Sequence, residues 1–205
     1  MDDRQDGGQG WSDNNSARER AMADQIGFAA SKFSFWYDSD PTFIRNIFFI
    51  GEAPGRAPYY IVVDDADMTT TSRKVGLTWH GRGTMTLNAL TQSAHWQCPS
   101  DYNGDDVYLD ITVAKPDGLT MEESSGPYYP FFSSMGTVYE EDVPYMIAST
   151  SGGSSYRFIS VLYPRKLTMS LPAIAGVTGE NAATVAGSDL VFTQDGTIGT
   201  VTVEG

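Results

Sequence analysis

FIRNIFFIGEAPGRAPYYIVVDDADMTTTSRKVGLTWH, residues 43–80, carries the strongest strand signals of this chain. Two dense apolar runs, Phe43–Ile50 and Tyr59–Val63, flank a connector rich in glycine and proline. A third run, Lys74–His80, alternates apolar and polar residues, which is the period of a strand with one buried face. Turn residues between short apolar runs are typical of consecutive antiparallel strands. The stretch therefore predicts three successive β-strands.

The remainder of the chain repeats this pattern at short spacing. Further expected strands are Gly83–Leu90, Val107–Val113, Tyr145–Ser149, Ser154–Tyr163, Asp189–Thr193 and Thr197–Val203. The last two are joined by Gln-Asp-Gly, a strong hairpin signal. The 11 tyrosines and 10 phenylalanines favour pleated, half-buried surfaces, and 21 glycines with 10 prolines supply turns. We expect an all-β fold, an antiparallel β-sandwich of about ten strands.

Several segments lie outside this strand pattern. Residues 1–16 are polar and predict a flexible lead, with residues 17–205 forming the sandwich domain. Ser16–Lys32 is rich in alanine and charge, and Ser16 with Glu19 fits a capping box, so at most one short helix is expected there. Residues 116–134 predict a loop, and Pro164 is expected to end the strand before it.

Charge and cysteine content exclude some classes of function. The net charge of −13, with 13 basic residues spread along the chain, argues against a nucleic-acid partner. Cys98 is the single cysteine, so an intrachain disulfide and a cysteine-based metal motif are excluded. No window approaches the roughly 18 consecutive apolar residues of a membrane span. The acidic start MDDRQDGGQG shows no secretory signal peptide.

Asp64, Asp65 and His80 are the candidate metal ligands. Imidazole and carboxylate groups suit zinc or a similar divalent ion. If the strands that carry them are antiparallel neighbours, the acids and the histidine lie at opposite ends and are separated. The alternative is that the two acids bond loop amides at a strand end and that His80 packs beside Trp79. We therefore expect no cofactor, with a divalent metal as the open alternative.

Aromatic and cationic residues are candidates for sugar contact. Aromatic faces stack on sugar rings, and Trp79 and Trp96 are the first candidates. The alternative is that such tryptophans belong to the core or its rim. Arg82, in a glycine-flanked turn just after His80, could hold a carboxylate through paired hydrogen bonds, or it could pair with one of the many acids.

The order of these motifs resembles the C-terminal β-sandwich region of heparinase II/III-like polysaccharide lyases. In that family a strand of the type "vRnvlfi" leads to "yyvvvDd", then to a strand ending in Trp-His or Trp-x-His, and later to "lyP". The corresponding segments here are Ile44–Ile50, Tyr59–Asp65, Leu77–His80 and Val161–Pro164. The resemblance covers residues 20–205.

The resemblance implies cleavage of uronic-acid polysaccharides by β-elimination. That reaction needs a group that neutralises the uronate carboxylate, a base such as His or Tyr, and an acid, usually Tyr. In the family a helical toroid and an earlier sheet supply most of these groups, and no part of this sequence resembles the toroid. His80 and Arg82 are the catalytic candidates left in this chain, and Trp79, Trp96 and Arg82 are those for substrate binding.

The resemblance also implies partners and a location. The expected partners are an anionic polysaccharide or other glycan and a helical lyase region, and the expected location is extracytoplasmic, as for a processed lyase. The alternative function is a non-catalytic β-sandwich that binds carbohydrate or associates with copies of itself through open strand edges.

Overall fold

The computed structural model describes residues 16–23, 26–34, 42–52, 57–68, 74–81, 83–98, 107–128, 141–178, 182–185 and 188–191. These residues form strands and connections, and none of them is helical. The strands are β1 (Ser16–Ala23), β2 (Ile26–Ser34), β3 (Thr42–Ile50), β4 (Tyr59–Asp67), β5 (Lys74–His80), β6 (Thr84–Asn88), β7 (Ser93–Cys98), β8 (Val107–Lys115), β9 (Thr120–Tyr128), β10 (Glu141–Ser151), β11 (Ser155–Lys166), β12 (Ile174–Gly176), β13 (Ala182–Val185) and β14 (Ser188–Val191).

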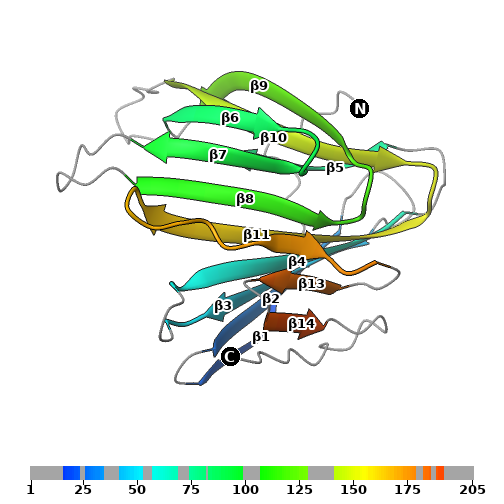
Figure 1. The fold of residues 1–205 in the computed structure, drawn as a ribbon. Coiled ribbons are helices and arrows are strands. Elements are labelled where there is room, and N and C mark those ends of the chain that lie inside the picture. Colours follow the sequence, from blue (N-terminus) through cyan, green and yellow to red (C-terminus); the bar gives the residue numbers. More distant parts are fainter. Residues whose placement is uncertain are drawn as a thin grey trace, which may run out of the picture.

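The strands form three antiparallel sheets (Figure 1). The main sheet has eight strands in the order β1-β2-β3-β4-β11-β8-β7-β6. The second sheet has the order β5-β10-β9, and the third has the order β12-β13-β14. The chain therefore leaves the main sheet after β4, forms β5 in the second sheet, and returns with β6. The all-β class and the antiparallel sandwich expected from the sequence are confirmed.

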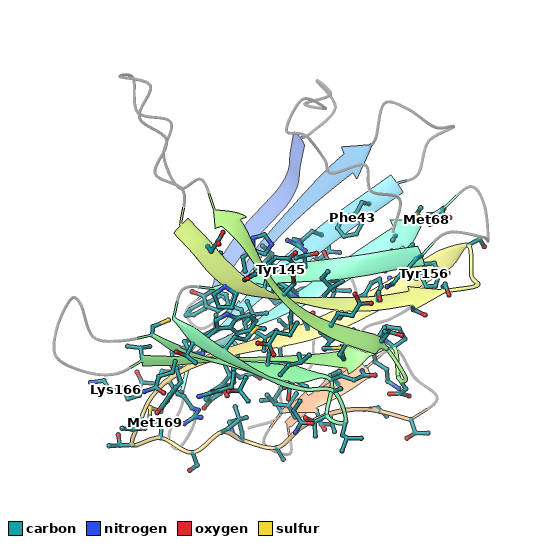
Figure 2. All side chains as sticks on the ribbon, turned by 90° about the horizontal axis from the view of Figure 1, so that it is seen from above. Phe43, Met68, Tyr145, Tyr156, Lys166 and Met169 are labelled. Atoms are coloured by element: carbon teal, nitrogen blue, oxygen red, sulfur yellow. The ribbon has the colours of Figure 1, made fainter. Side chains whose placement is uncertain are left out.

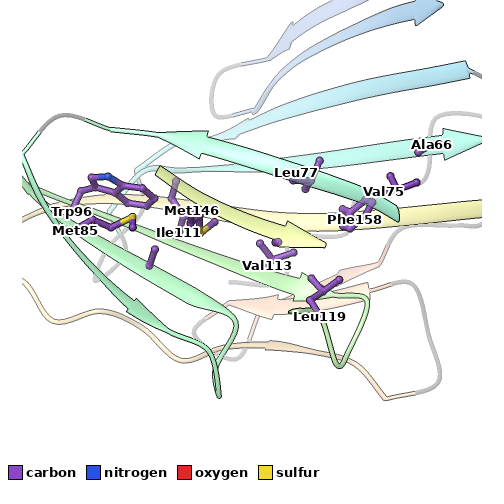
Figure 3. Close-up of a cluster of buried hydrophobic side chains, with 12 residues drawn as sticks. Ala66, Val75, Leu77, Met85, Trp96, Ile111, Val113, Leu119, Met146 and Phe158 are labelled. Carbon is purple, nitrogen blue, oxygen red and sulfur yellow. The ribbon is translucent and has the colours of Figure 1, made fainter. Parts of the chain in front are cut away.

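The main sheet is the middle layer because both of its faces carry a core. One face packs against β13 of the third sheet, through residues that include Ile61, Val161 and Val185. The other face packs against the second sheet, and Figure 3 shows this larger cluster. Its buried members are Ala66, Val75, Leu77, Met85, Ala94, Trp96, Ile111, Val113, Leu119, Met146, Ala148 and Phe158.

Strand β8 is buried on both faces, although its sequence predicts a half-buried strand. Ile111 and Val113 face the second sheet, as expected from the alternation. The residues between them are buried as well, because Asp110 is 5% exposed and Thr112 is 7% exposed. The prediction failed because β8 lies inside a three-layered arrangement, where the polar positions of the pattern are covered too.

Three further expectations for local structure are wrong. The segment expected as a short helix forms β1 and β2, because β2 pairs with β3 along its whole length and tertiary pairing outweighs weak helix propensity. The expected loop at residues 116–134 contains β9, which pairs with β10 despite its polar sequence. Pro164 lies inside β11 opposite Leu109, at a point where the pairing of β11 with β4 has already ended at Leu162.

Some predictions fall on residues outside the described ranges. These are the flexible lead, apart from Ser16, and the part of the predicted C-terminal hairpin from residue 192 onward, which includes its turn and the strand Thr197–Val203. The chain division at residues 16 and 17 stays a prediction. In its described part the structure contains no helix long and apolar enough to cross a membrane.

Candidate functional site

The second sheet brings His80 and Tyr145 side by side. His80 is the last residue of β5, and its register partner on β10 is Tyr145. Directly opposed residues of an antiparallel pair point to the same face. The two rings accordingly lie with their centroids 5.0 Å apart and their planes tilted by 42°. Figure 2 labels Tyr145 on this sheet. A histidine and a tyrosine thus share one surface.

Burial and backbone geometry both shape this pair. Partial burial lowers the pKa of His80 below its ordinary value of 6.5, because desolvation disfavours the imidazolium form. The side chain is nevertheless exposed enough to meet a ligand. A Cβ on Gly126 of β9 would lie 3.3 Å from Tyr145 Cε1, so the glycine leaves room for the tyrosine ring. The lowered pKa favours the neutral imidazole of His80, which is the form that can accept a proton.

Trp79 points the opposite way, toward the main sheet. The guanidinium carbon of Arg45 lies 5.2 Å from the centre of the Trp79 ring, a cation–π contact. Arg45 in turn donates two hydrogen bonds to Asp64, with Nε–Oδ1 at 2.7 Å and Nη2–Oδ2 at 3.0 Å. Trp79 is partly buried and belongs to the rim of the core between the sheets. The structure thus supports the packing alternative for Trp79.

The three candidate metal ligands lie apart. Asp64 and Asp65 are adjacent in β4, so their side chains leave opposite faces of the main sheet. Asp64 pairs with Arg45, and Asp65 pairs with Arg157, whose Nη2 donates to Oδ2 at 2.9 Å. His80 belongs to the second sheet. Within the described ranges, no three His, Cys, Asp or Glu side chains are grouped as a metal site.

The acids differ from their expected role as strand-end residues. β4 continues through Asp67, and Asp64 and Asp65 pair along it with both β3 and β11. Burial raises the pKa of Asp64 above its ordinary 3.8, while the hydrogen bonds and the charge of Arg45 act in the opposite direction. Both acids thus lie within β4 and pair with arginines of the neighbouring strands, in place of the expected bonds to loop amides.

Two other candidate residues have different outcomes. Trp96 is 0% exposed and lies in the core between the main and second sheets, beneath Gly81, so its ring offers no surface to a sugar. This candidate for substrate binding is thereby corrected: its alternating strand β7 turns the tryptophan inward. Arg82 lies outside the described residues.

A second polar cluster, which sequence reasoning missed, lies on the other face of the main sheet. Asp110 on β8 accepts hydrogen bonds from His95 Nδ1 at 2.8 Å and from Arg165 Nε at 2.7 Å. The ring of Tyr108 packs against both, with its centroid 4.5 Å from that of His95 and 4.8 Å from the Arg165 guanidinium carbon. Arg165 also donates to the carbonyl oxygen of Met169 at 2.8 Å. The cluster ties three strands and a turn together.

The signal for these residues was present in part. An acid at Asp110, between Tyr108 and Thr112 in a strongly apolar strand, indicates a paired carboxylate if the strand is buried on both faces. Tyr145 carried no such local signal, because only the register of β10 on β5 places it beside His80.

Comparison with known proteins gives the fold a precedent. No protein-family model matches the sequence, and no curated protein matches it. Among solved structures, the heparan sulfate lyase HepC from Pedobacter heparinus matches with a TM-score of 0.63 at 13% identity, covering 85% of this chain and 26% of that protein. A heparinase III gene product matches with a TM-score of 0.64 at 14% identity, again over 85% and 26%.

A further heparinase III structure matches with a TM-score of 0.58 at 10% identity and the same coverage. Identities this low establish the fold alone. The chain spans about a quarter of the length of the heparinases it matches. The resemblance expected from the sequence is confirmed at the level of architecture: the chain has the fold of a β-sheet region of heparinase III.

Proposed function

We propose that this chain is the β-sandwich region of a heparinase II/III-like polysaccharide lyase, which cleaves uronic-acid polysaccharides by β-elimination. The observation that carries the proposal is the match of 85% of the chain to heparan sulfate lyase and heparinase III structures. Those proteins are about four times as long as the matched part. The proposal therefore includes a helical region, acting with this chain, that supplies most of the catalytic groups.

The chemistry defines what this chain can contribute. A base removes the proton on the carbon next to the uronate carboxylate, the electron pair forms a carbon–carbon double bond, and the glycosidic oxygen leaves with a proton from an acid. A histidine with a lowered pKa beside a tyrosine matches the residue types that this exchange needs. We assign His80 and Tyr145 to the surface that faces the bound polysaccharide, with Arg82 as the candidate cation for the uronate carboxylate.

The location follows from the proposed substrate. Anionic polysaccharides of this class are met outside the cytoplasm, so the lyase would act in the periplasm or after secretion. The net charge of −13 opposes a polyanion at long range, which makes a local cation such as Arg82 necessary for binding.

The test is an elimination assay with the native protein purified from its source. Heparan sulfate is the substrate, and a neutral glucan, which has no uronate carboxylate, is the control. We expect the ultraviolet absorbance of unsaturated uronate to appear when the protein is given heparan sulfate, and not when it is given the neutral glucan. Binding of heparan sulfate without any such product would overturn the lyase reading and support the alternative of a non-catalytic carbohydrate-binding sandwich.

The two histidines of the chain provide a matched pair of variants. His80→Ala is expected to lower kcat/KM at least about 100-fold if the imidazole transfers a proton. His95→Ala removes the other imidazole, which is held by Asp110 on the main sheet, and should leave kcat/KM unchanged at a temperature where the variant is folded. Equal losses in both variants would contradict the assignment of His80.

A further inference from the structure

Part of the main sheet carries an apolar surface on the side of the second sheet. Ile47 and Phe49 of β3 and Tyr60 of β4 share one face, because Ile47 and Phe49 alternate with the core residue Phe48, and Tyr60 is the register partner of Phe49. Ile47 is 37% exposed and Tyr60 is 40% exposed. The rings of Phe49 and Tyr60 pack with centroids 5.1 Å apart. We call Ile47, Phe49 and Tyr60 the β3 face.

The border of the second sheet runs beside the β3 face. Arg45, two residues before Ile47 on the same face, contacts Trp79 of β5. Away from this border, the second sheet covers β8, because Met146 of β10 and Ile111 of β8 belong to the same buried cluster. Strands β3, β2 and β1 therefore continue past β5, and Figure 2 shows these blue strands fanning out to one side of the second sheet.

Strand β5 forms that border and has one open edge among the described strands. It pairs with β10 on one side, and no described strand pairs with it on the other. Every second residue of an edge strand directs its N–H and C=O groups outward. A strand added to this edge, about 5 Å further out, would lie over the β3 face and bury its apolar side chains.

A second copy of this chain fits this place poorly. Two antiparallel β5 strands would be related by a two-fold axis perpendicular to the second sheet, which puts both main sheets on the same side. Each main sheet continues past β5 through β3, β2 and β1, so the two would occupy the same space. The net charge of −13 on each copy adds repulsion.

We propose that the open edge of β5 and the β3 face together receive a β-strand from the rest of the lyase. This inference rests on the proposed function, since the matched heparinases contain about three quarters of their length beyond the matched part. The added strand extends the second sheet and alternates apolar residues, toward Ile47 and Tyr60, with polar residues toward solvent. It also continues the sheet that presents His80 and Tyr145.

Hydrogen exchange tests the proposal by comparing the native protein from its source with the 205-residue chain alone. In the native protein, the outward amides of Lys74–His80 should exchange at least roughly tenfold more slowly than in the isolated chain. Amides that are hydrogen-bonded to a neighbouring strand exchange only when the strands separate locally. Ile47→Asp, introduced into the source gene, should remove this protection. Leu90→Asp is the matched control, because Leu90 is 97% exposed in the turn between β6 and β7.

The outcomes separate the strand addition from the enzyme activity. Equal exchange in both samples would overturn the proposal, and so would protection in the isolated chain that grows with its concentration, which would indicate a second copy. Protection without elimination of heparan sulfate would support the strand addition and overturn the proposed function. Elimination of heparan sulfate without protection of these amides would support the proposed function and overturn the strand addition.

Discussion

Two buried carboxylates of the main sheet are satisfied in different ways. Asp64 is 0% exposed on the face toward the second sheet, and it accepts two hydrogen bonds from one cation, Arg45. Asp110 is 5% exposed on the opposite face and receives one bond from His95 and one from Arg165. The first carboxylate is the more deeply buried, and both of its bonds come from one side chain, whereas those of Asp110 come from two.

The difference shows what each pair contributes. Burying a carboxylate costs free energy that a single partner offsets only in part, which agrees with the raised pKa of Asp64. The Asp64–Arg45 pair therefore serves chiefly to hold Arg45 against Trp79 at the sheet border. Asp110 joins β7, β8 and β11 through its two partners, so we expect it to contribute more to stability.

The largest effect is expected from Asp110→Ala. The change leaves the Arg165 guanidinium, with a side chain 15% exposed, without its carboxylate and also releases His95. We expect the free energy of unfolding to fall by about 4 kcal/mol, measured by urea denaturation. Asp67→Ala, at an exposed position of β4, serves as the control and should cost little. A loss for Asp110→Ala no larger than that of the control would contradict the comparison.

Arg45→Ala should have the next largest effect. It leaves the Asp64 carboxylate buried without its cation, but the Arg45 side chain is 32% exposed, so water screens part of the lost interaction. We expect a loss of about 2 kcal/mol. The double variant Arg45→Met/Asp64→Leu removes both charges and should be close to wild type in the same denaturation experiment. A double variant as unstable as the single one would show that packing, not charge, is responsible.

The pH dependence of stability should sharpen the contrast. Because the folded-state pKa of Asp64 is raised above 3.8, this group stabilises the fold below pH 3.8, and the contribution is lost as the pH rises through the folded pKa. The difference in unfolding free energy between wild type and Asp64→Asn should therefore decrease with rising pH above 3.8. Arg45→Ala should move this window to higher pH. A difference that grows with pH would refute the assignment.

The smallest effect is expected at the exposed pair between the strands of the second sheet. Lys74 Nζ and Glu122 Oε1 lie 2.7 Å apart, and this contact lowers the pKa of Glu122. Solvent-exposed ion pairs contribute little to stability. Glu122→Gln should leave the Tm unchanged in differential scanning calorimetry, and a clear drop would mean that the edge strands depend on this pair.

Strands that carry their own pattern could be predicted from the sequence. Lys74–His80 was predicted with the bounds that β5 has, because Val75, Leu77 and Trp79 alternate with polar residues. β9 was missed, since its residues read as a polar loop and β10 alone supplies its ladder. Long-range pairing decides such segments, and single-sequence patterns do not contain it.

The candidate site shows the same division. His80 stood out because histidine is rare in this chain and follows a tryptophan at a strand end. Tyr145 did not stand out, because only the register between β5 and β10 places it beside His80, which lies 65 positions earlier in the sequence. For Trp96 the sequence left sugar contact and core packing open, because the strand that carries it was not predicted, and the inward face of β7 decides for the core.

The place of β11 in the main sheet also sets the order in which the chain can fold. β11 lies between β4 and β8, although it is made long after either, and the bond between Arg157 and Asp65 spans 92 positions. During synthesis, a nascent chain that ends before Ser155 holds β1–β4 and β6–β8 as two pieces with open inner edges. The late strand joins them, so we expect the main sheet to close only after translation has passed Lys166, with both inner edges exposed to mispairing until then.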